Sequence, residues 1–250
     1  FAVKNILNSM QRDLKVLKIF EELFWIIKKK VLSGGSSIDF SRAFFYDTVT
    51  NPIQAIITKM EQSKDENDKQ IENIANMRQY DFGKVVTHCP HCLHTIGKEY
   101  AKFDDGDFET IHHTELLADL VKTGKLTPKK EVKEELTYHD PCYLGRHHGE
   151  YDAPREILNA IPGVEVKEMV KNKDKSLCCG MGGGNMWYEM HEGSDLVENR
   201  LEHVGETKVY KLATSCSFCM INFNSGKGKV KETEELEVED IASILSKSIE

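Results

Sequence analysis

The chain has 250 residues, of which 40% are hydrophobic and 30% are charged, and its formal net charge at pH 7 is −8. This composition is ordinary for one large or two small globular domains. No block is basic enough to make nucleic-acid binding the main role, the anionic balance disfavours acidic membranes, and no run of 18 apolar residues encodes a transmembrane helix.

The N-terminal part of the chain predicts a long helix followed by a mixed region. Apolar residues recur at helical spacing through residues 1–33, and two glycines end the pattern. Three lysines follow Trp25, so the helix either packs inside the fold or docks on a membrane subunit. Residues 36–79 are mixed, and the polar run 62–70 predicts solvated helix or loop.

From residue 84 onward, short apolar runs alternate with amphipathic ones. Strands are predicted at 84–89, 108–112, 135–140, 164–169 and 208–214, and helices at 93–102, 115–122, 152–161 and 240–247. Val238 is either the end of a strand or the start of the last helix. Alternating strands and helices predict an α/β fold with a parallel sheet, in which binding sites form at the carboxyl ends of the strands.

The two CxxC motifs of the chain belong to a weak internal repeat. Cys89 and Cys216 are 127 positions apart, as are Cys92 and Cys219, and each pair follows a predicted strand. The same offset aligns Ile111 with Val238, Leu117 with Ile244 and Ala118 with Leu245. The pattern indicates that one strand–CxxC–helix unit occurs twice.

The seven cysteines indicate metal or cluster ligation in a reducing compartment. The number is odd, and two of the cysteines are adjacent, which is strained geometry for a mutual disulfide. The chain begins with Phe1 and has no signal-peptide pattern. We therefore expect a cytoplasmic protein whose sequence starts at an internal point of a longer polypeptide.

Five of these cysteines form the strongest signal in the sequence. Cys142 follows a predicted strand, Cys178 and Cys179 come after 35 intervening residues, and Cys216 and Cys219 follow after 36 more. Three separate loops therefore deliver five thiols, and thiolates are the ligands that iron–sulfur centres prefer. A zinc site built from four of the five, or a thiol redox pair at the second CxxC, remains an alternative.

Residues beside the five cysteines suit such a site. Four glycines let backbone approach a bulky inorganic core and turn N–H groups toward sulfur; they are Gly180, Gly182, Gly183 and Gly184. Arg146 is near enough in sequence to balance the negative charge of a thiolate-ligated cluster. Candidates for proton delivery or for binding an anionic substrate are His139, Arg146, His147 and His148.

Cys89 and Cys92 form half of a further metal site. Histidines surround them in the segment 87–94, but residues 1–88 contain no cysteine to complete the set. One interpretation is two reduced thiols at a degenerate site. The other is a second iron–sulfur cluster or a zinc ion, completed by a partner chain or by sequence not present here.

The motif pattern resembles the CCG cysteine-rich domain of heterodisulfide reductase catalytic subunits and related iron–sulfur subunits. The resemblance covers roughly residues 80–250 and is carried by five segments, 138–146, 151–156, 161–163, 178–180 and 182–184, together with the closing CxxC. It is closest to membrane-associated iron–sulfur oxidoreductases that pass electrons from electron-transfer flavoprotein to menaquinone.

The resemblance implies a fold and a division into domains. The fold is two pseudo-twofold-related βα halves of Rossmann-like type with parallel sheets, preceded by N-terminal helices. Residues 1–80 would be an N-terminal helical segment, a fragment of a degenerate or missing first CCG half. Residues 81–134 would end the first CCG-like half, and residues 135–250 would form the second, which carries the iron–sulfur site.

The resemblance also implies a cofactor, a function and partners. It assigns a noncubane 4Fe–4S cluster to Cys142, Cys178, Cys179, Cys216 and Cys219. The chain would be a subunit of a redox complex that reduces a disulfide or passes electrons between a flavoprotein and a quinone-linked partner. Partners would be a flavoprotein, a ferredoxin-type iron–sulfur subunit or both, and a membrane subunit would hold the complex at the cytoplasmic membrane. A non-catalytic electron relay and a zinc-structured interaction module are the rival functions.

Overall fold

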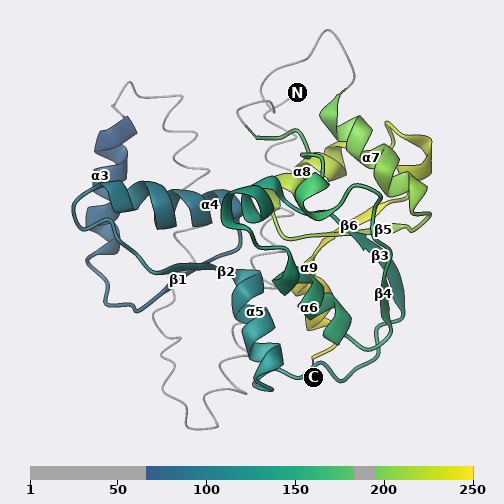
Figure 1. The fold of residues 1–250 in the computed structure, drawn as a ribbon, viewed down its shortest axis with the longest axis horizontal. Coiled ribbons are helices and arrows are strands. Elements are labelled where there is room, and N and C mark those ends of the chain that lie inside the picture. Colours follow the sequence, from purple (N-terminus) through teal and green to yellow (C-terminus); the bar gives the residue numbers. More distant parts are fainter. Residues whose placement is uncertain (1–65, 183–194, 250) are drawn as a thin grey trace.

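A computed structural model describes residues 66–182 and 195–249 of the chain (Figure 1). The predicted N-terminal helix, Gly183 and Gly184 lie outside these ranges. The described part is an α/β structure in which every strand pairing is parallel, so the predicted fold class is confirmed.

The N-terminal half of the described chain contains a small sheet of two strands, β1 and β2. Its elements in chain order are α3 (Glu66–Met77), β1 (Val85–Thr87), α4 (Pro90–His94), the helical turns η2 (Thr95–Glu99) and η3 (Tyr100–Lys102), β2 (Thr110–His112) and α5 (His113–Lys122). Helix α4 begins with proline at its first position, where no backbone donor is lost. With η2 and η3 it makes residues 90–102 helical throughout, three residues longer than predicted.

The C-terminal half contains a four-stranded sheet in the order β4-β3-β5-β6. Its elements are β3 (Glu134–Tyr138), η4 (Tyr143–His147), α6 (Asp152–Ala160), β4 (Val164–Val166), η5 (Lys173–Lys175), α7 (Leu196–Glu206), β5 (Lys211–Thr214), α8 (Ser217–Gly226), η7 (Lys231–Thr233), β6 (Glu237–Asp240) and α9 (Ile241–Ser246). Side-chain caps start two of the helices, because Asp195 accepts from the Val197 N–H and Asp240 from the Ala242 N–H.

Helices cover both faces of the four-stranded sheet (Figure 1). On one face, α5, α6 and α9 pack against Leu136, Tyr138 and Ala213, which are fully buried. On the other face, α7 and α8 pack against Leu212 and Leu236. Successive residues of β5 thus point to opposite faces, as a buried parallel strand requires. A separate small core beneath β1 includes Ile74 and Phe108.

The two halves are related by the internal repeat, and three pairs of equivalent residues touch each other. Cys89 and Cys216 interact through their sulfurs. The ring centroids of His91 and Phe218 are 5.0 Å apart. His113 Nε2 lies 3.5 Å from Asp240 Oδ1. All three pairs are 127 positions apart in the sequence. Residues meet their own equivalents only at a twofold axis, so a pseudo-twofold axis passes between the halves.

Some elements differ from the sequence-based prediction. Helix α7 was not predicted, and Val238, predicted as either a strand end or a helix start, lies inside β6 and pairs with Leu212. The strand predicted at 164–169 ends at Val166. Beyond it, Glu168 turns its carboxylate to Arg155 and Met169 enters the core.

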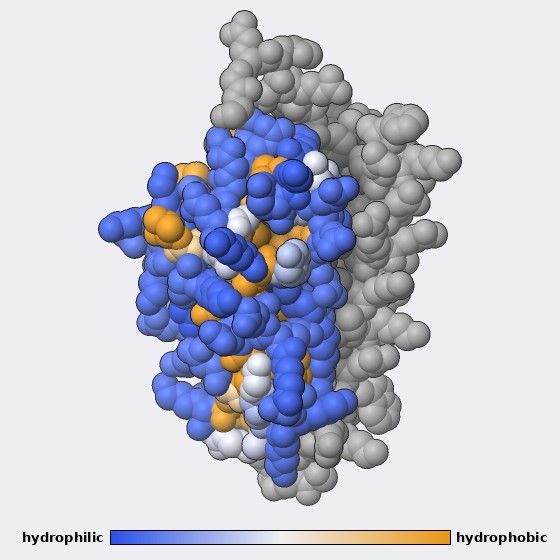
Figure 2. Space-filling view, turned by 90° about the vertical axis from the view of Figure 1, so that its right-hand side faces the viewer, coloured by the Kyte–Doolittle hydropathy of each residue, from blue (hydrophilic) through white to orange (hydrophobic). Residues whose placement is uncertain are grey.

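The right-hand side of the molecule in Figure 1 is mainly hydrophilic where the structure describes it, with small apolar patches separated by charged side chains (Figure 2). Within the described ranges, no helix is long and apolar enough to cross a membrane.

Candidate iron–sulfur site

Both CxxC motifs lie at the carboxyl ends of strands. Cys89 follows β1 and Cys216 follows β5, and each has extended backbone geometry at the N-cap of the next helix, α4 or α8. Cys92 and Cys219 lie one turn into these helices. A thiol one turn into the helix therefore faces the same strand end as the thiol at its cap.

Two further loops bring the remaining cysteines to this edge. Cys142 is the N-cap of the turn η4, four residues after the end of β3. Cys178 and Cys179 follow η5. The sulfurs of Cys142 and Cys178 are 3.7 Å apart, which is contact without a disulfide, and all seven cysteines are free thiols.

The seven thiols form one continuous series of neighbours. Cys178 interacts with both Cys142 and Cys179, and Cys179 in turn with Cys219. Cys219 neighbours Cys216, which interacts with Cys89, and Cys89 with Cys92. The structure therefore brings the five predicted ligand cysteines together. It also places the half-site of the first CxxC beside them rather than apart.

Two smaller groups within this series have metal-like spacing. Sulfurs of Cys179 and Cys219 and one ring nitrogen of His139 lie within 4.8 Å of one another. The sulfurs of Cys89 and Cys216 form a similar group with a ring nitrogen of His91, whose Nδ1 is 3.7 Å from Cys89 Sγ.

The adjacent thiols share protons unequally. The contact with Cys142 lowers the pKa of Cys178, and the same contact raises the pKa of Cys142. The Gly180 N–H, 3.4 Å from Cys178 Sγ, further stabilises a thiolate there. A thiolate with a backbone donor is the form in which cysteine binds a metal ion or cluster.

Gly180 is required by its backbone and its surroundings. Its φ is +91°, and a Cβ at this position would lie 2.9 Å from Leu196 Cβ. Only glycine adopts this conformation at no steric cost. Gly182 is less constrained, because a Cβ there would be 3.9 Å from its nearest neighbour, His91 Nε2.

A buried histidine–arginine pair lies behind the thiols. His139 and Arg200 are both completely buried. Arg200 Nε donates to His139 Nδ1 at 3.1 Å, and a terminal nitrogen of Arg200 donates to the Lys171 carbonyl at 2.7 Å. Burial, followed by the charge of Arg200, holds the pKa of His139 well below its usual range. Burial likewise lowers the pKa of Arg200 to about 10.

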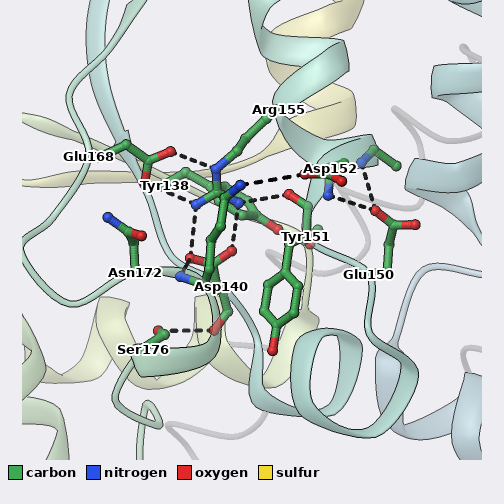
Figure 3. A network of polar contacts seen from close by, with 12 residues as sticks. Tyr138, Asp140, Glu150, Tyr151, Asp152, Arg155, Glu168, Asn172 and Ser176 are labelled. Atoms are coloured by element: carbon green, nitrogen blue, oxygen red, sulfur yellow. Dashed lines mark hydrogen bonds and ion pairs between the residues drawn. The ribbon is translucent and has the colours of Figure 1, made fainter.

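An ion-pair network ties the two ligand loops together (Figure 3). Arg155 on α6 donates to both carboxylate oxygens of Asp140, at 2.7 and 3.0 Å, and to Glu168 at 2.6 Å. Asp140, two residues before Cys142, also accepts from the backbone N–H of Lys173 at 2.8 Å. One buried carboxylate thus fixes the loop of Cys142 against the segment that leads to Cys178.

Arg146 makes a second link between these loops. Its side chain is exposed overall, and its guanidinium donates to the Ser176 carbonyl, two residues before Cys178. The arginine is therefore tied to the segment that leads to Cys178. Its role toward a cluster or an anionic substrate stays a prediction.

Aromatic rings lead from the thiols toward the surface. The ring centroids of His91 and Tyr143 are 4.1 Å apart, and those of Tyr143 and His147 are 4.4 Å apart. His147 is exposed. His94 contacts Tyr143, His147 and His148 edge-on. Burial and then the charge of Lys98 lower the pKa of His148 to about 4. Proton delivery by His147 or His148 remains a prediction.

Arg200 and Arg155 were not predicted as functional residues. The burial of Arg200 could have been predicted, because the apolar stripe of α7 is formed by Val197, Leu201 and Val204. Arg200 lies on the same side of the helix as this stripe. Nothing in the sequence, however, indicates that this arginine meets a histidine 61 positions earlier.

Comparison with known proteins adds a family to this geometry. The cysteine-rich domain family CCG matches residues 54–97 and 136–224, which together make up more than half of the chain and include all seven cysteines. The chain belongs to the CCG family. The CCG match is split, and its two segments end just beyond the two CxxC motifs, in agreement with the two pseudo-twofold-related halves.

Curated relatives of this CCG chain carry the names of redox proteins. "Probable iron-sulfur-binding oxidoreductase FadF" of Bacillus subtilis is 39% identical over 179 residues, 71% of this chain and 25% of the relative. "EtfAB:quinone oxidoreductase" of Syntrophomonas wolfei is 36% identical over 188 residues, 72% of this chain and 26% of the relative. One of the subunits of the dihydromethanophenazine:CoB–CoM heterodisulfide reductase of Methanosarcina barkeri is 33% identical over 179 residues. The match covers 71% of this chain and 43% of that subunit.

The matched part of the CCG chain spans about a quarter of the first two relatives and less than half of the third.

Proposed function

We propose that the chain is an iron–sulfur subunit of a heterodisulfide-reductase-like redox complex. Its ligands would be the five thiols delivered by three loops, namely Cys142, Cys178, Cys179, Cys216 and Cys219, holding a noncubane 4Fe–4S cluster. The continuous contact of these thiols is the observation that carries the proposal.

The surroundings of the thiols fit an anionic group. Arg200 is a fully buried cation beside Cys179 and Cys219, and one of its terminal nitrogens has no hydrogen-bond partner among the described residues. An uncompensated buried charge costs several kcal/mol, about 3–5 when a pair is broken. A thiolate-ligated cluster supplies the missing negative charge, and the Gly180 N–H is an available donor to sulfur.

A zinc-structured module fits less well. A zinc site that used His139 beside Cys179 and Cys219 would need a free lone pair on the imidazole ring. Arg200 donates to His139 Nδ1, so the proton of the neutral ring is on Nε2, and neither nitrogen offers a free lone pair. Five thiols in contact also exceed the four ligands of a structural zinc ion.

A bound cluster would supply one-electron redox chemistry. The chain's own residues would hold it, shield it from water and set its charge environment. We propose that the whole complex reduces a disulfide or passes electrons between a flavoprotein and a quinone-linked partner. The names of the relatives support this, since one belongs to a heterodisulfide reductase and another is an EtfAB:quinone oxidoreductase.

We further propose a cytoplasmic location at the membrane through a partner subunit. A relative from Chromohalobacter salexigens, 32% identical over 182 residues, is named "Probable membrane-anchored ferredoxin". Electrons would reach the site from a flavoprotein or a ferredoxin-type subunit. A subunit that only relays electrons, without a substrate of its own, is the alternative within the same class.

Cys89 and Cys92 would form an accessory metal site for a second cluster or zinc. Its position next to Cys216 supports this, because His91 and Cys216 supply two further donor atoms within reach. Whatever binds there would lie in direct contact with the five-thiol site.

Metal analysis tests the cofactor. We expect about four iron and four sulfide per chain in anaerobically purified protein, with a paramagnetic signal on oxidation. About eight iron would mean a second cluster at Cys89 and Cys92, and zinc in addition to four iron would mean a zinc site there. Zinc without iron would refute the redox proposal and favour the interaction module.

Cys179→Ser tests the ligand set. It removes one of five ligands, so we expect loss of most of the iron and of the paramagnetic signal. Cys92→Ser is the matched control outside the five, and it should retain about four iron per chain. Full iron content in Cys179→Ser would contradict the assignment. Turnover of a disulfide substrate by the assembled complex would then separate a catalytic subunit from a relay.

A further inference from the structure

We propose that Arg200 and His139 form a positioning pair that sets the reduction potential of the cluster, with His139 Nε2–H donating a hydrogen bond to the thiolate of Cys179 or Cys219. The inference rests on the proposed function above. It adds Arg200, on helix α7, to a site whose predicted ligands come from three loops.

The contact with Arg200 fixes the tautomer of His139. A guanidinium has only donors, so Nδ1 must accept the 3.1 Å hydrogen bond from Arg200 Nε. A neutral imidazole carries one proton, which is therefore on Nε2. Nε2 is buried and has no hydrogen-bond partner among the described residues. A buried N–H without a partner is costly, and the nearby sulfurs are the available acceptors.

The ring of His139 is also held in place. Phe223 of α8 packs edge-on against it, with ring centroids 4.8 Å apart. The Lys171 carbonyl anchors the guanidinium of Arg200 at 2.7 Å. The donor is thus oriented from two sides before any cluster binds, as the outer partners of metal sites commonly are.

The positive charge of Arg200 acts on the same site. Within the described ranges, no carboxylate forms an ion pair with this guanidinium. Asp140 is the carboxylate that most favours its charge, but Arg155 already holds both Asp140 oxygens. The sulfurs of Cys219 and Cys179 also favour the charge. Hydrogen bonds to sulfur and nearby positive charge both raise the potential of an iron–sulfur cluster.

The pair therefore gives His139 a different task from the proton delivery predicted from sequence. To donate a proton and remain neutral, the ring would have to take up a proton at Nδ1, which faces Arg200. Iron ligation by His139 is disfavoured for the same reason. The geometry leaves a fixed N–H donor.

A redox titration of anaerobically purified protein, followed by EPR, tests the inference. We expect His139→Phe to shift the midpoint potential to a lower value while iron and sulfide remain at the wild-type content. His139→Gln keeps an N–H donor and should stay closer to wild type. Arg200→Met should lower the potential in the same direction, because both the charge and the tautomer lock are lost. Glu202→Gln, an exposed change on the same helix, should leave the potential unchanged.

The outcomes separate this inference from the function on which it rests. Wild-type protein without iron and sulfide would overturn both. An intact wild-type cluster whose potential is the same in His139→Phe and Arg200→Met would overturn only the pair. Equal loss of iron in His139→Phe and His139→Gln would reduce His139 to a packing role and would also overturn it.

Discussion

Arg155→Met should destabilise the protein by breaking a buried ion pair. Asp140 is 3% exposed and Arg155 is 12% exposed, so the variant leaves a carboxylate charge in the interior with only the Lys173 N–H as a direct partner from the other loop. Breaking such a pair costs about 3–5 kcal/mol. Glu168, 38% exposed, adds little to that figure, because exposed ion pairs contribute about 0–1 kcal/mol.

Urea unfolding followed by circular dichroism measures the effect. With a slope of about 2 kcal/mol per molar urea, a loss of about 3 kcal/mol lowers the midpoint by about 1.5 M. Adding Asp140→Asn removes the unpaired charge while keeping an oxygen that accepts the Lys173 N–H. The double variant should therefore be more stable than Arg155→Met alone.

The control is Lys122→Met, which breaks an exposed ion pair with Glu156 at 3.9 Å. It should change stability by less than about 0.5 kcal/mol. A change as small as this in Arg155→Met would refute the argument that the buried carboxylate depends on its arginine. Because Asp140 holds both ligand loops, we also expect Arg155→Met to lower the iron content.

Two further predictions concern the site's surroundings. Burial and the charge of Lys98 hold the pKa of folded His148 at about 4, whereas the pKa of the unfolded residue is 6.5. As the pH falls from 6.5 toward 4, the unfolded state therefore binds a proton that the folded state does not, and the folded state loses stability. His148→Gln should therefore gain in urea midpoint relative to wild type between pH 7 and pH 5, and parallel pH profiles would contradict this. Gly180→Ala should destabilise by about 1–3 kcal/mol, measured in urea, from positive φ and from contact with Leu196. Gly124 has a φ of +70°, but a Cβ at this position would lie in open space. An equal loss of stability in Gly124→Ala would therefore show that the contact between position 180 and Leu196 contributes nothing.

Much of the fold could be predicted from the sequence because each element is short and well marked. Strands β1 and β5 are apolar runs that end at CxxC motifs, and the offset of 127 positions identifies the repeat. Local patterns record which face of an element is buried. They predicted the five clustered thiols through their loops and through a specific family resemblance.

The parts that could not be predicted depend on contacts between distant elements. The contact between Cys89 and Cys216 arises only when the halves pack about their axis, so the sequence alone suggested a separate second site. The Arg200–His139 pair needs α7 to pack beside the segment that follows β3. Arg155 lay in a recognised motif, but its two carboxylate partners are 15 and 13 positions away on different segments. Periodicity assigns a face to a residue, not a partner.

The contact of His113 with Asp240 bears on how the duplicated halves depend on each other. In a symmetric dimer of one repeated unit, each residue on the axis meets an identical copy. Two aspartates there would repel each other in a buried setting, and two histidines would lose the acidic partner. Once one copy carries His113 and the other Asp240, with the two atoms 3.5 Å apart, neither half matches a second copy of itself as well as it matches the other. At this position the two halves are therefore specific for each other, although the internal repeat makes their sequences alike.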